Sequence, residues 1–184
     1  MSSLKKQWNH LRFLIIAPHV NYQDKKLQMD IERWKNVLNL NGNEKQVLKH
    51  LLSHYKEFRN LFVLRNTGRR IFCRMIKLLY PPLDSLYIMT NNIGGGLYIQ
   101  HGFSTYIAAE AIGENCWINQ QVTIGYRDNT TAPVIGNNVT ITCGAKVLGP
   151  ITVGDNSIIG ANAVVIKDVE AGAVMGGVPA RRLK

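Results

Sequence analysis

The sequence predicts a mainly β protein: a parallel β-helix with a C-terminal tail over residues 87–184, behind an N-terminal α-helical region over residues 1–86. Two periodicities support this division. Apolar residues follow a helical period between residues 24 and 79, whereas aliphatic residues recur every six positions after residue 90. Charge divides at the same place, because residues 1–90 hold 16 Lys and Arg against 6 Asp and Glu, while residues 91–184 hold 6 against 6.

The helical region is expected to contain three helices. Asp24 and Asn43 are suitable N-caps for the first two, because their side chains can accept hydrogen bonds from the free N–H groups of a first turn. The third is predicted over residues 60–79 and ends before Pro81, since proline cannot continue a helix. The apolar faces of the first two helices are Leu27, Ile31, Trp34 and Leu38, and then Val47, Leu48, Leu51, Leu52, Tyr55 and Phe58.

The six-residue repeat of the second half is sustained over many units. A small or aliphatic residue lies four positions after most of the repeating aliphatics, and glycine directly follows several of them. A period of this kind is typical of a β-helix. The repeating aliphatics are Ile112, Ile118 and Ile124, and then Ile135, Ile141, Val147, Val153, Ile159 and Val165.

Each six-residue unit is expected to form one short strand and one turn, so that three units make a triangular coil of about 18 residues. About four coils fit between residues 93 and 170. The ends of such a solenoid need covers, so we expect the helical region to act as a cap domain at one end and residues 169–184 to close the other. The spacing from Ile124 to Ile135 is eleven residues, and the polar segment 125–133 is predicted to be an extruded loop.

Composition narrows the function classes. The three cysteines are too scattered for a disulfide framework and are expected to be small buried side chains. His50 and His54 have a metal-binding spacing, but no third ligand accompanies them, so we expect no metal. Lys5 and Lys6 precede an apolar stretch that weakly resembles a signal peptide, although Arg12 interrupts it. With no run long enough to span a membrane, the protein is expected to be cytoplasmic.

His101 is the candidate catalytic residue. It is the only histidine after residue 54, and it follows a glycine-rich entry to the repeats. Its unperturbed pKa lies near neutrality, so an imidazole can take a proton from a hydroxyl during nucleophilic attack.

From about Ile93 to Arg182, the sequence resembles the serine acetyltransferase branch of the hexapeptide-repeat acetyltransferases. Families with this repeat wind as a left-handed parallel β-helix, an exception to the usual right-handed crossover. The basic helical front and short repeat are most similar to members that acetylate sugars in capsule or exopolysaccharide synthesis. The matching segments are Gly94–His101, Asn119–Gly125, Cys143–Gly149, Ile159–Val165 and Gly177–Arg181.

The resemblance implies an enzyme in which two neighbouring prisms of a homotrimer form each active site. It implies that acetyl-CoA is the co-substrate and that His101 deprotonates the acceptor hydroxyl. The positions that match CoA-binding residues are Gly125, Gly144, Ala161 and Lys167, with Arg181 and Arg182 near the nucleotide phosphates. Small residues would let the ligand approach the backbone, and cations would offset its phosphate charge.

The sequence departs from the serine enzymes at two places. Gln100 stands where they usually have an acidic residue, and Ala132 stands where their extruded loop supplies a second histidine. Because free serine needs charged partners for its carboxylate and ammonium groups, these differences favour a sugar hydroxyl in surface-polysaccharide synthesis as the acceptor. Arg127 and Asp128 are possible substitutes for the missing charges, and Glu110 is a candidate carboxylate partner for His101.

Three other functions remain as alternatives. The first is serine O-acetylation within cysteine synthesis. A zinc carbonic anhydrase on the same prism needs three histidines across the repeats, and this half has one. A non-catalytic β-helix scaffold would not require His101 or the Gly-Val-Pro-Ala-Arg ending. The basic front can meet an anionic inner-membrane surface or an acidic glycan, and we expect no nucleic-acid partner.

Overall fold

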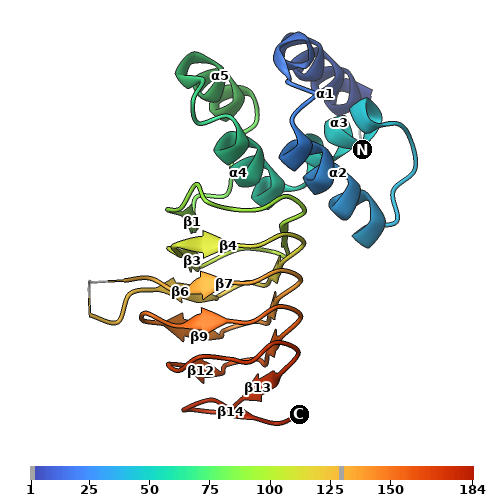
Figure 1. Ribbon diagram of the computed structural model, residues 1–184. Coiled ribbons are helices and arrows are strands. Elements are labelled where there is room, and N and C mark those ends of the chain that lie inside the picture. Colours follow the sequence, from blue (N-terminus) through green and yellow to red (C-terminus); the bar gives the residue numbers. More distant parts are fainter. Residues whose placement is uncertain (1–2, 129–130) are drawn as a thin grey trace. The chain divides into compact units, whose positions relative to one another are not determined.

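The computed structural model describes residues 3–128 and 131–184, which fold into two compact units that divide between Leu83 and Asp84 (Figure 1). The first unit is helical and the second is a solenoid of short strands. The fold class predicted from the repeats, mainly β with N-terminal helices, is confirmed. No helix in the described parts of the chain is long and apolar enough to cross a membrane.

The helical unit contains more helices than the three predicted. The apolar stretch near the N-terminus, which had only weakly resembled a signal peptide, forms a helix. The segment predicted as one helix over residues 60–79 contains two, because Asn66 ends the first by donating from its side chain to the Phe62 carbonyl, 2.8 Å away. The helices are α1 (Ser3–Ile16), the 3₁₀ turn η1 (Ala17–His19), α2 (Lys25–Val37), α3 (Glu44–His54), α4 (Lys56–Arg65) and α5 (Arg70–Leu79).

The predicted caps and the proline stop are confirmed. Asp24 accepts hydrogen bonds from the backbone N–H groups of Lys26 and Leu27, at 2.9 and 3.3 Å. Asn43 and Gln46 exchange side-chain and backbone hydrogen bonds as a capping box. Helix α5 ends at Leu79, before the two prolines.

One buried ion pair crosses the core of the helical unit. Arg65 of α4 donates Nε to Asp30 Oδ2 at 2.7 Å and an Nη to Oδ1 at 3.1 Å, and both side chains are almost fully buried. This fork geometry satisfies both carboxylate oxygens at once. The pair joins α4 to α2 beside Trp34, whose ring meets Phe58 edge to face at 5.2 Å.

Arg59 is the second buried cation of the helical unit. Its guanidinium donates to the carbonyls of Leu52 and Ser53 at the end of α3, and to that of Pro81. Burial lowers the pKa of Arg59, with a smaller contribution from the nearby charge of Arg12. Each carbonyl it contacts would otherwise lack a helical partner, so the arginine closes α3 and ties the proline segment to it.

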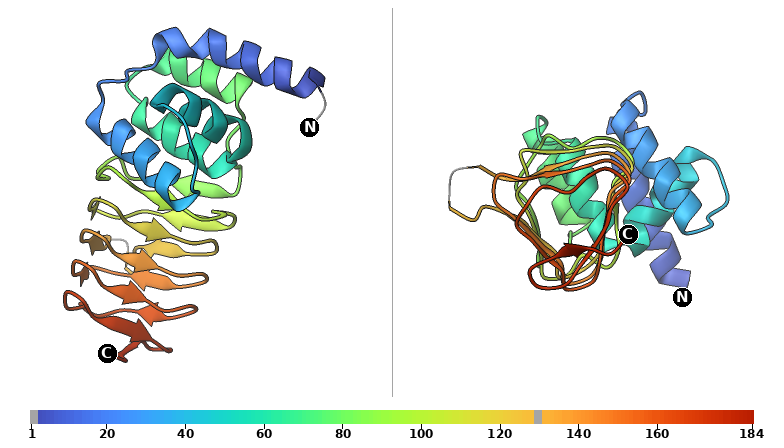
Figure 2. Two further views of the ribbon diagram at one scale, coloured as in Figure 1. Left: turned by 90° about the vertical axis from the view of Figure 1, so that its right-hand side faces the viewer. Right: turned by 60° about the horizontal axis from the view of Figure 1, so that its bottom comes forward.

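The solenoid is built from three parallel sheets that run along its length (Figure 2). From Ile93 to Val169 the chain makes the four coils expected there, because Ile93, Ile112, Ile135, Val153 and Val169 occupy the same place in successive turns. Sheet A has five strands, the first of which lies before the recognised repeat. Sheet A contains β1 (Leu86–Ile88), β3 (Thr105–Ile107), β6 (Thr123–Gly125), β9 (Lys146–Leu148) and β12 (Val164–Val165). Sheet B contains β4 (Ala111–Ile112), β7 (Val134–Ile135) and β10 (Thr152–Val153), and sheet C contains β2 (Tyr98–Ile99), β5 (Trp117–Ile118), β8 (Thr140–Ile141), β11 (Ile158–Ile159), β13 (Val174–Gly176) and β14 (Arg181–Arg182).

The repeating aliphatics stack on one another inside the prism. Ile118 pairs with Ile141, and Ile141 with Ile159, and all three are fully buried. Pairs such as Val134 and Thr152 lie 18 residues apart, as the repeat predicts. Pairs across the extruded loop, such as Trp117 and Thr140, lie 23 apart, so the loop accounts for five additional residues.

Residues with positive φ form turns at the corners of the prism. Asn115, Asn138 and Asn156 occupy this conformation where sheet B passes to sheet C, with φ between 55° and 59°. Asparagine tolerates positive φ better than most residues. Gly113 lies just before Asn115, and a Cβ there would lie 2.6 Å from the backbone of Gly136 in the next coil. The stacked coils therefore exclude a side chain at position 113.

The last strand of the solenoid runs against the others. β14 pairs antiparallel with β13, with Met175 opposite Arg182, and it forms the outer edge of sheet C (Figure 1). The expected closure of this end by the C-terminal segment takes this form, which limits the exposed edge available for pairing.

We predict that Gly113→Ala lowers the free energy of unfolding by about 1–3 kcal/mol, because the new methyl group would press on stacked backbone that cannot move independently. The measurement is the thermal melting temperature. Gly125→Ala is the matched control, since a Cβ at Gly125 meets no atom of the described residues within 4 Å. Equal melting temperatures for the two variants would show that the coils yield at this corner.

Candidate active site

His101 lies on a widened corner of the prism, where the chain passes from sheet C to sheet A. Eight residues separate Tyr98 from Tyr106 in the first coil, whereas six separate their partners Trp117 and Thr123 in the next. Two additional residues thus enter at this corner. His101 itself has a φ of 64°, an uncommon conformation for a residue with a side chain. Such backbone conformations gather at functional sites.

The imidazole of His101 is exposed to solvent, and it has no hydrogen-bond partner within residues 3–128 and 131–184. Its neighbour Gln100 is held in place instead: the Gln100 Oε1 accepts a hydrogen bond from the Trp117 indole at 3.2 Å. The same indole packs edge to face on Tyr98 at 4.8 Å. Gln100 therefore fixes the aromatic wall of sheet C, and in the described part of the chain no carboxylate forms a hydrogen bond or ion pair with His101.

Gly144 and Ala161 lie on the same corner as His101, in later coils. Hydrogen bonds between turns stack this corner: Gln121 N–H donates to Phe103, and Gly144 N–H to Gln120, at 3.0 and 3.1 Å. Gly144 has a φ of 73°, and a Cβ there would clash with the side-chain oxygen of Asn162. Packing alone thus requires glycine at position 144, whereas Ala161 is exposed and open to a ligand.

Gly125 and Lys167 lie on the next corner, where sheet A passes to sheet B. Gly149 N–H donates to the Gly125 carbonyl at 2.9 Å, which joins the two coils there. A Cβ built at Gly125 would have no atom of the described residues within 4 Å. The glycine is therefore bordered by open space. A hollow of about 330 Å³ opens at this corner, lined by Arg127, Asp128, Leu148, Pro150, Ile151, Ile166, Lys167 and Asp168.

Arg181 and Arg182 are on β14, beyond the last full coil. Both are exposed, and Arg182 forms an ion pair with Glu170. One chain therefore brings together His101, Gly144 and Ala161 on one corner, and Gly125 and Lys167 on another. Ala180, directly before Arg181, donates its N–H to the carbonyl of Val164 at 2.8 Å, so the tail that leads to the arginines pairs with β12, between Ala161 and Lys167 in the sequence.

The extruded loop begins after Gly125 and carries Arg127 and Asp128 exposed to solvent. Ala132 is buried at the base of the loop, and its N–H donates to Glu110 Oε1 at 3.3 Å. Glu110 thus lies at the corner between sheets A and B and holds the loop. Within one chain it is not beside His101, so the suggested carboxylate partnership is not formed there.

Lys146 is a cation near the histidine corner that the sequence analysis did not single out. Its Nζ donates to the carbonyl of Gln121 at 2.7 Å, on the turn directly after that of His101. Side chains alternate between the two faces of a strand, so a residue just before a buried aliphatic points outward. Lys146 directly precedes the repeating aliphatic Val147, and the sequence repeat could therefore have predicted that Lys146 points outward. Among the described residues, no three His, Cys, Asp or Glu side chains gather as a metal site would need.

Residues 132–167 match the family described as bacterial transferase hexapeptide (six repeats). The serine acetyltransferase of Staphylococcus aureus strain Mu50 is 41% identical over 143 residues, which cover 75% of this chain and 63% of that protein. The corresponding enzyme of Synechococcus elongatus is 41% identical over 93 residues, 48% of this chain and 38% of that protein. The chain thus spans less than two thirds of the length of these curated relatives.

Solved structures give the same result. Serine acetyltransferase from Brucella abortus strain S19 superposes with a TM-score of 0.69 at 26% identity, covering 93% of this chain and 71% of that one. The Neisseria gonorrhoeae serine acetyltransferase in complex with serine superposes with a TM-score of 0.66 at 25% identity, covering 87% and 68%. In sequence and in its β-solenoid this chain is therefore similar to the serine acetyltransferases, and residues 132–167 match the bacterial transferase hexapeptide family.

Proposed function

We propose that the chain is an O-acetyltransferase that moves an acetyl group from acetyl-CoA to a hydroxyl, with His101 as the general base. The observation that carries the proposal is the exposed imidazole on a widened corner of a prism whose homologues are serine acetyltransferases. A packed structural histidine would need neither the two additional corner residues nor the exposure.

In the proposed reaction, a ring nitrogen of His101 takes the proton of the acceptor hydroxyl as its oxygen attacks the thioester carbonyl carbon. The tetrahedral intermediate then collapses, the carbon–sulfur bond breaks, and the imidazolium returns the proton to the leaving CoA sulfur. The products are the O-acetyl ester and free CoA. Backbone N–H groups at the corners are the natural donors to the oxyanion.

The division of the candidate residues between two corners fits a site shared by two chains. In the homotrimer we propose, the histidine corner of one prism, with Ala161, faces the corner of a neighbour that holds Gly125 and Lys167. The column from His101 to Ala161 spans three coil steps, roughly 14 Å, which gives an extended pantetheine arm a continuous edge to follow. Lys167, Arg181 and Arg182 are the cations available to the CoA phosphates, and no step of the proposal requires a metal.

For the acceptor, the comparisons favour serine over the sugar that the sequence differences suggested. The named relatives are serine acetyltransferases, and one solved structure is a complex with serine. We therefore place L-serine first, which would give the chain a role in cysteine synthesis. We assign the recognition of the carboxylate and ammonium groups of serine to Arg127 and Asp128, which are exposed on the loop.

A sugar hydroxyl is the second candidate, as part of surface-polysaccharide synthesis. It is favoured by Ala132, which is buried and apolar where the serine enzymes place a histidine, and by the uncharged Gln100, which is committed to Trp117. A neutral acceptor requires no ion pair at either position. A non-catalytic scaffold would leave the exposed imidazole without a role.

His101→Ala is expected to lower kcat by about 100- to 10,000-fold, the usual contribution of a positioned general base. The measurement is release of CoA thiol with a saturating acceptor, alongside the sedimentation of the variant. His54→Ala is the matched control, since His54 is an exposed histidine in the helical unit. Turnover at the unmodified rate in the His101 variant would refute the base assignment.

Mixing two inactive variants tests the shared site. Co-expression of His101→Ala with Lys167→Ala chains should restore activity, because about one quarter of the interfaces would pair an intact histidine with an intact lysine in random trimers. Each variant alone should remain impaired. If one chain supplied both residues to the same site, the mixture would be no more active than its components.

The acceptor is identified by the ratio of kcat/KM for L-serine to that for sugar hydroxyls, measured with the same thiol assay. If serine is the acceptor, Arg127→Gln should raise KM for serine by at least about tenfold through loss of a charged hydrogen bond. If only sugars are turned over, the acceptor is a sugar hydroxyl, the second candidate. The loss of kcat in His101→Ala would then still test whether His101 is the general base.

A further inference from the structure

The helical unit exposes an apolar stripe along α1. Leu4, Trp8, Leu11 and Ile15 recur at steps of three and four residues, so they share one side of the helix. All four are exposed, Trp8 at 53%, while Asn9, Phe13 and Ile16 on the opposite side are buried in the unit. Large apolar groups aligned in this way on a surface indicate a contact with something outside the unit.

Helix α5, which contacts α1, adds two of the most exposed apolar side chains of the described residues. Ile71 and Leu78 are 85% and 81% exposed and lie two turns apart on one side of α5. The two helices are held together where Arg12 of α1 donates to the carbonyl of Leu79 at 2.7 Å, and they run alongside each other in the left view of Figure 2.

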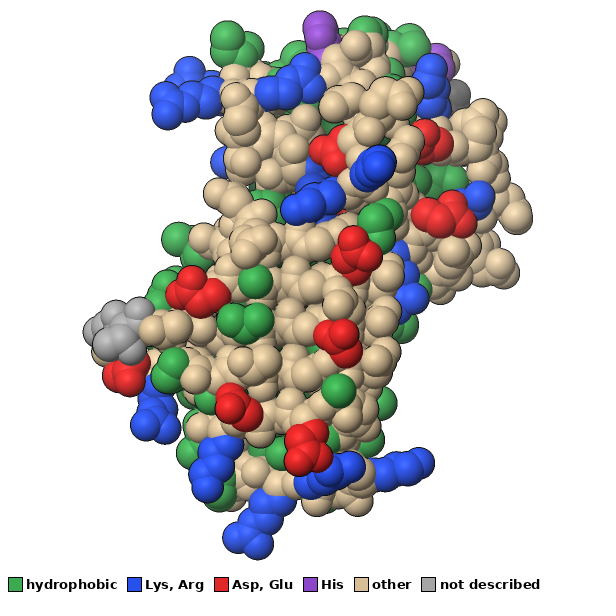
Figure 3. All heavy atoms as spheres, viewed as in Figure 1, with side chains coloured by type: hydrophobic (Ala, Val, Ile, Leu, Met, Phe, Trp, Pro, Cys, Tyr) green, Lys and Arg blue, Asp and Glu red, His purple; other side chains and the backbone are tan. Residues whose placement is uncertain are grey.

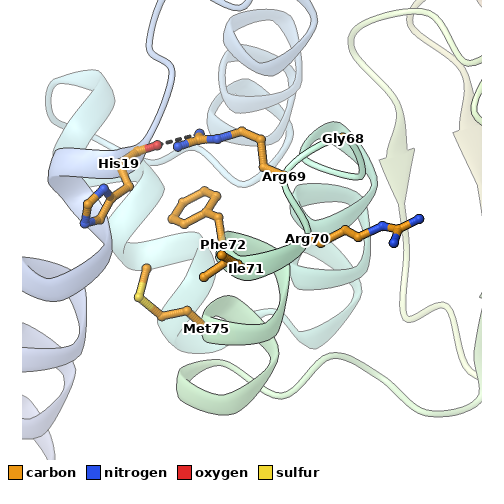
Figure 4. Close-up of a pocket in the computed structure, with 7 residues that line it drawn as sticks. All are labelled: His19, Gly68, Arg69, Arg70, Ile71, Phe72 and Met75. Atoms are coloured by element: carbon orange, nitrogen blue, oxygen red, sulfur yellow. Dashed lines mark hydrogen bonds between the residues drawn. The ribbon is translucent and has the colours of Figure 1, made fainter.

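A hollow of about 580 Å³ opens beside the start of α5 (Figure 4). Phe72, Ile71 and Met75 supply its apolar lining, and Arg69 and Arg70 lie at its margin. Arg69 packs over the Phe72 ring at 4.5 Å and donates to the His19 carbonyl at 2.6 Å, whereas Arg70 extends away into solvent. The hollow thus combines an apolar floor with the guanidinium of Arg69 at its margin.

The charge on these helices has one sign. The sequences of α1 and α5 contain no Asp or Glu, whereas α5 carries Arg70, Arg74 and Lys77, all exposed. Lys and Arg side chains stand out from the helical unit in the space-filling view (Figure 3). A second copy of this surface would bring cations against cations, which opposes self-association through it. An anionic partner would be attracted.

We propose that α1 and α5 dock the protein onto an anionic lipid surface, beyond its proposed activity. A helix with Trp and Leu on one side and Lys and Arg around them lies in a membrane interface, where the apolar groups enter the acyl boundary and the cations meet lipid phosphates. The hollow beside Phe72 has the lining to take part of a lipid chain. A nucleic acid would leave the apolar stripe exposed, and an acidic protein would require matching apolar groups.

The test is co-sedimentation of the full chain with phosphatidylcholine vesicles that contain phosphatidylglycerol, at low and high salt, against pure phosphatidylcholine vesicles. Binding should require the anionic lipid and weaken with salt. The double variant Arg74→Gln/Lys77→Gln should bind about 25-fold more weakly, from a factor of roughly five for each cation near an anionic surface. The matched control is Lys25→Gln/Lys26→Gln on α2, which should bind unchanged.

Fluorescence supplies the second readout, because Trp34 is buried and only Trp8 among the helical tryptophans can enter the lipid. Its emission should shift to shorter wavelength with anionic vesicles, and the shift should be absent in Trp8→Phe. Binding that is equal for neutral vesicles, or unchanged in Arg74→Gln/Lys77→Gln, would overturn the proposal. So would vesicle-independent self-association that Trp8→Ser/Leu11→Ser abolishes, which would assign the stripe to a second copy of the chain.

Discussion

The solenoid depends on the close stacking of identical turns. Each corner must pass the backbone through a sharp bend while leaving the coil above and the coil below at strand spacing, and this fixes which residues the corners can hold. The asparagines at one corner and the excluded Cβ at Gly113 are the direct result. The buried aliphatics add hydrophobic stabilisation, but the corner backbone determines the period to which they must conform.

That constraint explains why so much of the fold could be predicted. A repeating backbone bend imposes a repeating sequence, so Ile118, Ile141 and Ile159 could be predicted to be repeating aliphatics of the prism, and in the structure they stack on one another. The helical unit has no such repetition. The break between α4 and α5 depends on one side-chain hydrogen bond of Asn66, which the apolar period does not report. Helix α1 exposes much of its apolar side, so its sequence did not show the pattern of a half-buried helix.

In the candidate site, too, the sequence identified single residues but not which residues lie close together in space. His101 could be selected because it is isolated in the sequence, and its widened corner is detectable as an eight-residue interval in a six-residue series. The separation of Lys167 and Gly125 from it could not be foreseen, since corner assignment requires knowing how many residues each turn uses. Gly144 illustrates a further ambiguity: a residue that matches a ligand-binding position can be fully explained by the packing of Asn162.

The five residues added between β6 and β7 show how such a scaffold can change its specificity. The coils before and after the loop resume the same pairing, with Ile112 opposite Ile135 and Ile135 opposite Val153, so the insertion disturbs neither neighbour. The length and side chains of the loop can consequently change while the stacked coils on either side keep their register. If the proposed acceptor site includes Arg127 and Asp128, a new acceptor would require changes at this one bend, with the frame of the prism left intact.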